Sequence, residues 1–163
     1  DDTGKQVAQG EVGEIRVRGE TVMKGYWNRP NETEETISAD GWLRTGDLGH
    51  LDENGRLFIS AGRKKDLIIR AGENVSPLAI ENALMNHPAI AEVAAVGIAD
   101  ERVGEKVKVF AVLREGAQAT GQELKELCRK KLPAFMIPDI FEFMESLPKT
   151  ATGKILKSEL RNI

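Results

Sequence analysis

The pattern of apolar residues changes near residue 66, and this change constrains the fold more than any other feature of the chain. Upstream of it, apolar and polar residues alternate in short runs such as 14–18, which is typical of half-buried strands. Asn54 and Gly55 lie between two apolar-bearing runs and predict a β-hairpin, because both residues accept a positive φ. A short exposed helix is expected within 30–38, and no upstream stretch has the periodicity of a long helix.

Short strands and helices alternate in the rest of the chain. Ser76 can cap a helix and Pro77 suits its first position, so we expect a helix that begins there and ends before Pro88. Thr120 and Glu123 have the spacing of a capping box, which predicts the start of a second helix. The remaining expected elements are a turn at 72–74, strands over 67–69, 93–98, 106–113 and 140–144, and a short helix over 157–161.

These two patterns predict an α+β fold with two structural units. We place a small β-rich unit at 1–64 and a compact unit, in which a small central sheet is flanked by helices, at 65–163. The length of 163 residues is close to the usual size of one domain, but the change of pattern favours two. Because the first residue is Asp1 and not Met, we expect the chain to be an excised or processed piece of a longer protein.

The composition argues against several classes of protein. Apolar residues make up 40% and charged residues 30%, which is typical of a folded chain and not of a disordered one. The net charge is −3, whereas proteins that bind nucleic acid through their overall charge are usually basic. Cys128 is the only cysteine, which fits the reducing cytoplasm, and neither histidine has zinc-ligand spacing with it. No apolar run reaches the about 18 residues that a transmembrane segment needs.

Four polar segments carry side chains suited to chemistry, and each also has a purely structural interpretation. LRTGDL at 43–48 places Asp47 after a glycine, where a carboxylate can bind a diol such as ribose; the alternative is an ordinary turn aspartate. GRKKD at 62–66 has three consecutive cations, which suit phosphate, although a solvated charged run has the same composition. This segment also lies at the boundary between the two units, where a hinge can absorb changes in φ and ψ.

The other two segments lie in the second unit. RAGENVSP at 70–77 places a glycine-bearing loop before a capped helix, which lets a backbone approach a ligand; the alternative is a plain turn. LPKTATGKI at 147–155 displays Lys154 on an exposed loop, from which an ammonium can neutralise a phosphoryl group in transfer; the alternative is an ordinary surface lysine. The Walker pattern GxxxxGK[ST] is absent from the chain.

Taken in this order and spacing, the segments resemble the C-terminal third of the AMP-forming acyl- and aryl-CoA synthetase family, which also contains luciferases and the adenylation domains of peptide synthetases. The resemblance covers nearly the whole chain, because it includes GEIRVRG at 13–19, MKGYWN at 23–28 and GWLRTGD at 41–47. It implies that the first unit is the end of a large adenylating domain and that the second is a complete, mobile C-terminal domain.

The resemblance also implies roles for particular residues. Asp47 would bind the ribose hydroxyls of ATP or acyl-AMP, and Arg63 would contact the ribose and phosphate region. Lys65 matches the hinge about which the C-terminal domain turns between two half-reactions. Ala71 and Gly72 would line the tunnel through which a thiol reaches the acyl group after that turn.

Lys154 matches the lysine that stabilises adenylate formation, in which a carboxylate attacks ATP to give acyl-AMP and pyrophosphate. The thiol of CoA then displaces AMP to give a thioester. The implied substrates and cofactors are therefore a carboxylic acid, here expected to be a fatty acid, together with ATP, Mg²⁺ and CoA. The implied partner is the upstream large domain of the same chain, with no nucleic acid involved.

This sequence also departs from the family pattern. Ala79 stands where the family often has a glutamate, and we expect a modest effect on stability and none on the chemistry. The phosphate loop, the acyl pocket and the metal-associated glutamate of the family precede this region, so the isolated chain is expected to make no acyl-AMP. Two alternatives stay open: an adenylation domain that loads a carrier protein, and a non-catalytic interaction module.

Overall fold

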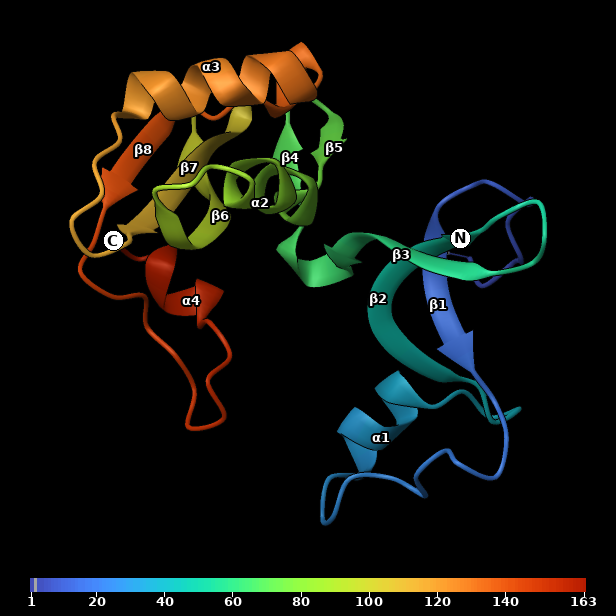
Figure 1. The fold of residues 1–163 in the computed structure, drawn as a ribbon. Coiled ribbons are helices and arrows are strands. Elements are labelled where there is room, and N and C mark those ends of the chain that lie inside the picture. Colours follow the sequence, from blue (N-terminus) through green and yellow to red (C-terminus); the bar gives the residue numbers. More distant parts are fainter. Residues whose placement is uncertain (2) are drawn as a thin grey trace. The chain divides into compact units, whose positions relative to one another are not determined.

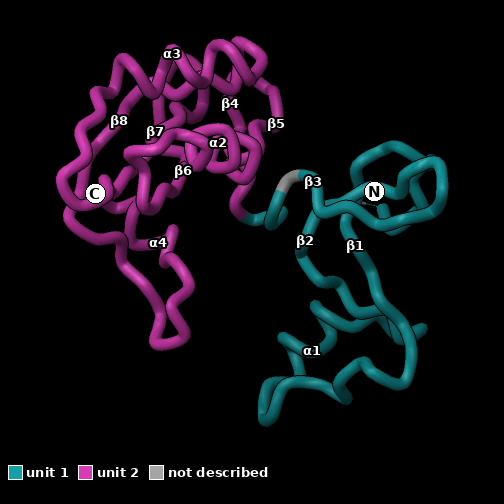
Figure 2. Tube along the Cα trace, in the orientation of Figure 1, with its two compact units in different colours: residues 1–65 teal, residues 66–163 magenta. Residues whose placement is uncertain are grey.

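The computed structural model describes residues 1, 3–60 and 62–163 and has an α+β fold, as the sequence predicts. The chain divides into two compact units, Asp1–Lys65 and Asp66–Ile163, which Figure 2 distinguishes by colour. A 3₁₀ turn, η1 (Lys64–Asp66), lies where the first unit ends and the second begins. No helix in the described part of the chain is both long enough and apolar enough to cross a membrane.

Unit 1 is built on a three-stranded antiparallel sheet with the strand order β1-β2-β3. Its elements are β1 (Gly13–Val17), α1 (Pro30–Thr36), β2 (Leu43–Leu51) and β3 (Leu57–Arg63). The helix α1 buries none of its residues, which confirms the short exposed helix that the sequence predicts. Figure 1 shows β2 curving between its two neighbours, with α1 in the connection from β1 to β2.

The predicted hairpin joins β2 to β3, but its turn differs from the expected one. Only Gly55 takes a positive φ, of 74°, whereas Asn54 does not. The Asp52 carboxylate organises the turn by accepting N–H bonds from Asn54 at 2.9 Å and from Arg56 at 2.8 Å. Because the connection is longer than two residues, a turn that ends in one left-handed glycine fits it better than one with two.

Unit 2 contains a five-stranded sheet in which β5-β4-β7-β6 pair antiparallel and β8 pairs with β7 in parallel. Its strands are β4 (Ile68–Arg70), β5 (Glu73–Val75), β6 (Ile90–Asp100), β7 (Gly104–Leu113) and β8 (Ile140–Phe143). Its helices are α2 (Pro77–Met85), α3 (Gly121–Lys131), the 3₁₀ turn η2 (Ala134–Met136) and α4 (Lys157–Leu160). The predicted turn at 72–74 is corrected, because Glu73 already belongs to β5 and the turn lies at Ala71 and Gly72.

The starts of α2 and α3 follow the predicted caps. The Ser76 hydroxyl accepts the Ala79 N–H at 3.2 Å, with Pro77 in the first turn of α2. At α3 the Thr120 hydroxyl accepts the Glu123 N–H, while the Glu123 carboxylate accepts the Thr120 N–H, so the capping box is complete. Both helices therefore begin where their side chains satisfy backbone N–H groups that have no partner within the helix.

The strand β7 separates two apolar clusters, one on each face of the sheet in unit 2. Val107, Val109 and Ala111 face a cluster that also takes in side chains of α2 and α3. Phe110 faces the opposite cluster, which Leu160 of α4 completes. Figure 1 shows the corresponding layers, with α3 along one side of the sheet and α4 on the other. Alternate β7 residues thus share a face, and both faces of the sheet are covered.

Candidate functional site

In unit 1, Asp47 and Arg63 lie directly opposite each other in the register of β2 and β3. Their Oδ1 and Nε atoms are 3.4 Å apart, and both side chains are 40% exposed. The Arg63 Nε is itself buried and makes no hydrogen bond, so the pair is an ion pair without good hydrogen-bond geometry. A carboxylate and a guanidinium thus lie side by side, and each side chain is partly exposed.

The backbone around Asp47 holds this pair in place. The Arg63 Nη2 donates to the Thr45 carbonyl oxygen at 2.8 Å. The Thr45 hydroxyl donates to the Ile15 carbonyl oxygen at 2.8 Å and accepts the Asp47 N–H at 3.1 Å. Gly46 has a φ of 74°, and a Cβ there would lie 3.0 Å from Arg63 Nη2. A side chain at this glycine would therefore crowd the guanidinium.

Lys65 is the last residue of unit 1 and lies in the 3₁₀ turn η1. Its neighbours in this turn make ion pairs within their own units. Lys64 Nζ is 3.8 Å from Glu14 Oε2, and Asp66 Oδ1 is 3.3 Å from Arg161 Nη2. The position at a unit boundary agrees with a hinge, and the hinge role itself stays a prediction.

Ala71 and Gly72 form the tight turn between β4 and β5, with φ values of 50° and 85°. The Ala71 N–H donates to the Val103 carbonyl oxygen at 2.7 Å. Next to the turn, the Arg70 guanidinium donates to the Ile137 carbonyl oxygen at 2.9 Å and to Asp139 Oδ1 at 2.7 Å. These bonds surround a turn in which a non-glycine residue, Ala71, takes the left-handed conformation, which is uncommon.

Lys154 lies on a narrow loop that precedes α4. The Thr150 N–H donates to the Lys154 carbonyl oxygen at 2.8 Å, and Gly153, with a φ of 83°, turns the chain at the tip. The Lys154 side chain is exposed, and among the described residues none pairs with its ammonium. A loop of this kind presents a cation to solvent at the end of a short hairpin.

The structure therefore brings some predicted site residues together and keeps others apart. Asp47 and Arg63 form one pair in unit 1, and Ala71 and Gly72 form one turn in unit 2. Figure 1 shows the Lys154 loop extending from the α4 end of unit 2, whereas the turn with Ala71 lies at the ends of β4 and β5. The sequence did not predict the direct pairing of Asp47 with Arg63, because it depends on the register of two strands.

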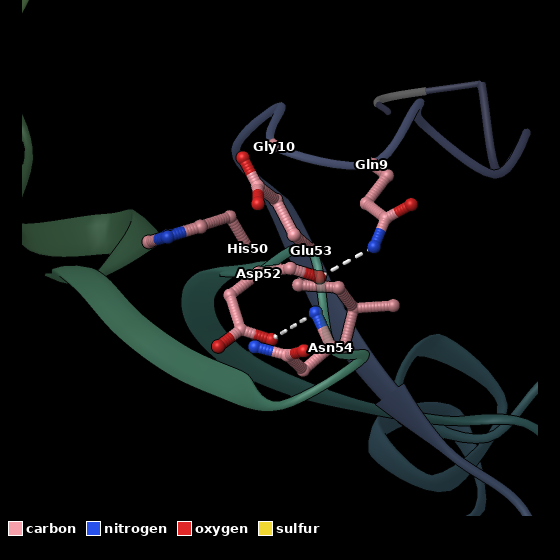
Figure 3. A pocket seen from close by; sticks show the side chains of 7 residues that line it. Gln9, Gly10, His50, Asp52, Glu53 and Asn54 are labelled. Atoms are coloured by element: carbon pink, nitrogen blue, oxygen red, sulfur yellow. Dashed lines mark hydrogen bonds between the residues drawn. The ribbon is translucent and has the colours of Figure 1, made fainter.

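A hollow of about 610 Å³ lies at the turn of the β2–β3 hairpin and contains none of these residues. Its lining consists of Gln9, Gly10, His50, Leu51, Asp52, Glu53 and Asn54, most of which Figure 3 labels. The Asp52 carbonyl oxygen accepts from Gln9 Nε2 at 2.5 Å, and its carboxylate caps the turn. Within the described residues, no group of three or more histidine, cysteine, aspartate or glutamate side chains is arranged to hold a metal ion.

Two ion pairs that the sequence did not predict flank the Lys154 loop. Lys149 Nζ lies 2.7 Å from Glu92 Oε1, and Lys157 Nζ lies 2.7 Å from Glu81 Oε1. The two glutamates belong to β6 and α2, far from the loop in sequence. No local sequence pattern predicts these contacts, because the partners are distant in sequence. The only local indication is that lysines lie on both sides of the polar loop.

Comparisons with known proteins agree with this arrangement. Residues 79–154 match the family model of the AMP-binding enzyme C-terminal domain. The chain is 48% identical over 160 residues to a long-chain-fatty-acid–CoA ligase of Bacillus subtilis, covering 98% of this chain and 28% of the ligase. It is 43% identical over 159 residues to a sulfoacetate–CoA ligase of Cupriavidus necator, covering 98% of this chain and 31% of that protein.

A solved structure is similar over almost the whole chain. The crystal structure of ATP-bound MatB from Rhodopseudomonas palustris has a TM-score of 0.90 and 36% sequence identity, and the match covers 99% of this chain and 32% of that one. The chain therefore spans less than one third of the length of each of these three proteins.

Proposed function

The chain belongs to the AMP-forming acyl-CoA synthetase family, and from this premise we propose that it is the C-terminal part of a ligase that joins a carboxylic acid to CoA with ATP. The observation that carries the proposal is the continuous similarity to CoA ligases across both units. On this proposal, unit 1 ends the large adenylating domain, unit 2 is its mobile partner, and Lys65 is the hinge between them. We place the enzyme in the cytoplasm.

In the first half-reaction, a carboxylate oxygen of the acid attacks the α-phosphorus of ATP, and pyrophosphate leaves. Asp47 accepts hydrogen bonds from the ribose hydroxyls, and the partly exposed Arg63 guanidinium binds an oxygen of the ribose or phosphate. The Lys154 ammonium, unpaired among the described residues, stabilises the negative charge that develops on the phosphates. A fixed cation of this kind acts on the transition state more than on the bound substrates.

In the second half-reaction, the thiol of CoA gives its proton to solvent and its sulfur attacks the acyl carbonyl carbon; the bond from that carbon to the phosphate oxygen breaks, and AMP leaves. The turn at Ala71 and Gly72 lines the path of the thiol, because a backbone with little side chain leaves room for it. Rotation about Lys65 exchanges the two faces of unit 2 between the steps. Mg²⁺ would accompany ATP, but the described residues offer no cluster of ligands for it, so no step is assigned to it.

A fatty acid is the substrate we propose, on the similarity to the long-chain-fatty-acid–CoA ligase of B. subtilis. The acid is tested by assaying thioester formation by the ligase that contains this chain with a series of acids. Preference for a short polar acid would contradict the fatty acid and leave the ligase chemistry intact.

Lys154→Ala, made in that ligase, tests the assignment of the site. We expect adenylate formation, measured by pyrophosphate exchange, to fall by about 10²- to 10³-fold, because a preorganised charge at the transition state is removed. Thioester formation from supplied acyl-AMP should be nearly unchanged. Lys130→Ala, at an exposed lysine near the end of α3, is the matched control and should leave both steps at the parent level.

The alternatives give different results in the same assays. An equal loss of both half-reactions in Lys154→Ala would contradict the proposed role of the lysine. An enzyme that loads a carrier protein would form acyl-AMP but would not release AMP when CoA is added. A non-catalytic interaction module would show no change in either step.

A further inference from the structure

The loop that carries Lys154, residues 148–156, is closed at its base by its own backbone. The Leu156 N–H donates to the Pro148 carbonyl oxygen at 2.8 Å, and residues Lys149 and Ile155 form an isolated antiparallel bridge. These bonds fix the shape of the hairpin, but they do not tie it to the rest of unit 2. Its orientation therefore depends on contacts with other elements.

Apolar contacts supply part of this anchoring. Leu147 precedes the loop and is buried in the cluster that Phe110 and Leu160 share, and Ile155 packs against the same cluster. Apolar packing is non-directional, so it holds the base of the loop against the sheet without specifying the direction of the tip. Directional contacts are needed for that.

Two ion pairs provide directional contacts, one on each side of the loop. Lys149 Nζ binds Glu92 Oε1 of β6, and Lys157 Nζ binds Glu81 Oε1 of α2, each at 2.7 Å. The two lysines lie on either side of Lys154, and both distances are typical of charge-assisted hydrogen bonds. The loop is thus tied at its two ends to two different elements of the unit.

The pair at Glu81 is the better shielded of the two. Its side chains are 16% and 20% exposed, against 32% and 38% for the pair at Glu92. Glu81 Oε1 also accepts the Ala95 N–H at 2.8 Å, so this carboxylate is itself held by the sheet. Solvent screens an exposed pair more strongly, and Glu81 is therefore the stronger anchor.

The carboxylate of Glu92 depends on its lysine for a different reason. Its Oε2 atom is buried and has no hydrogen-bond partner, so the contact with Lys149 through Oε1 compensates much of its burial. Loss of the lysine would leave this partly exposed carboxylate with a less well compensated charge. The two ends of the loop are thus held by ion pairs that differ in their exposure to solvent.

We propose that Glu81 and Glu92 are positioning residues that orient the Lys154 loop for adenylate formation. This inference rests on the proposed function of Lys154, whose own ammonium makes no contact with the described residues that could orient it. The glutamates act through Lys157 and Lys149 and do not touch the substrate. Glu81 has the larger effect, since its pair is less exposed.

Hydrogen exchange in the purified chain tests the anchoring without reference to activity. In Glu81→Gln the side-chain oxygen can still accept the Ala95 N–H, but the ion pair is lost. A hairpin released from its anchor opens its own backbone bonds more often, so we expect the amides of Thr150 and Leu156 to exchange about tenfold faster, and about threefold faster in Glu92→Gln. Lys157→Gln should match Glu81→Gln, and Lys157→Arg should restore slow exchange.

Kinetics of the ligase that contains this chain test the consequence for the reaction. Glu81→Gln should lower kcat for adenylate formation about tenfold with little change in the KM for ATP, because the orientation of Lys154 matters in the transition state. Thioester formation from supplied acyl-AMP should be unchanged. The double variant Glu81→Gln with Lys157→Gln should have nearly the same kcat as either single variant, since both changes remove the same ion pair.

Glu126→Gln is the control, because it removes an exposed ion pair, with Arg129, elsewhere in unit 2. It should leave the loop amides and both half-reactions at the parent level. Loop exchange in Glu81→Gln no faster than in this control would overturn the inference. Faster exchange without slower adenylate formation would also overturn it. If Lys154→Ala is then equally without effect, the proposed function has failed as well.

Discussion

The two units differ in how they bury apolar side chains, although both are built on a β-sheet. Among the described residues, every buried apolar side chain except Leu48 lies in unit 2. In unit 1, by contrast, Trp27 is 89% exposed and Ile59 is 61% exposed. Unit 2 thus has two apolar clusters of its own, whereas unit 1 is a thin sheet held by backbone hydrogen bonds.

This difference bears on how each unit holds its functional residues. Asp47 and Arg63 are positioned by strand register and by the hydroxyl of Thr45, with little packing beneath them. The turn at Ala71 is supported by a sheet whose two faces are covered. A folded core resists opening, whereas strands with few buried contacts open at low free-energy cost. The expected consequence is that unit 2 unfolds later and more cooperatively than unit 1.

Phe110→Ala and Phe58→Ala form a matched pair that tests this comparison with the largest expected effect. Phe110 is fully buried, and its truncation should lower the free energy of unfolding of unit 2 by about 3–5 kcal/mol. Phe58 is 47% exposed, and its truncation should cost unit 1 about 1 kcal/mol or less. Urea titration of each variant gives both values.

Two probes already present in the chain report the units separately. Both tryptophans, Trp27 and Trp42, belong to unit 1, so tryptophan fluorescence follows its unfolding. The buried thiol of Cys128 belongs to unit 2, so its labelling follows the opening of that unit. Coincident transitions by both probes in all variants would contradict separate unfolding of the units.

Alkaline pH should weaken unit 2 through the same thiol. Burial raises the pKa of Cys128 from its ordinary value of 9.0 to about 11, because the core disfavours the thiolate. The folded state thus favours the neutral thiol. This contribution is complete below pH 9, is lost as the pH rises towards 11, and amounts to about 2–3 kcal/mol.

The measurement is the free energy of unfolding of unit 2 between pH 8 and pH 11, compared with that of Cys128→Ala. Lysines and tyrosine also titrate in this range, but they are common to both proteins and cancel in the difference. The parent should lose its advantage over the variant as the pH rises. A difference that stays constant with pH would show that the folded thiol ionises as readily as the unfolded one.

Features set by residues three or four positions apart were predictable from the sequence. The cap at Ser76 and the capping box of Thr120 with Glu123 are both present, because each depends only on one turn of helix. The alternation of apolar residues in β7 also placed the correct face against the core. These signals are local, so no knowledge of the tertiary structure is needed to interpret them.

The candidate site was less predictable, because its geometry depends on distant contacts. The resemblance identified Asp47 and Arg63, but their pairing follows from the strand register and an irregularity between Leu48 and Gly49. The anchoring of the Lys154 loop depends on glutamates in α2 and β6. Side chains of this kind look like ordinary surface charges until the fold brings them to their partners.

Ala71→Gly tests the same contrast between the units with the smallest expected effect, and with the opposite sign. Ala71 has a φ of 50°, where an L-residue with a Cβ is strained, so glycine should stabilise unit 2 by about 0.5–1 kcal/mol. The matched position in unit 1 is Asn28, with a φ of 53°. Asparagine enters the left-handed region more readily, so Asn28→Gly should change the stability of unit 1 by less than about 0.5 kcal/mol. Urea titration with the two probes separates these values. An equal gain in the free energy of unfolding at both positions would contradict the expectation that Ala71 is more strained than Asn28.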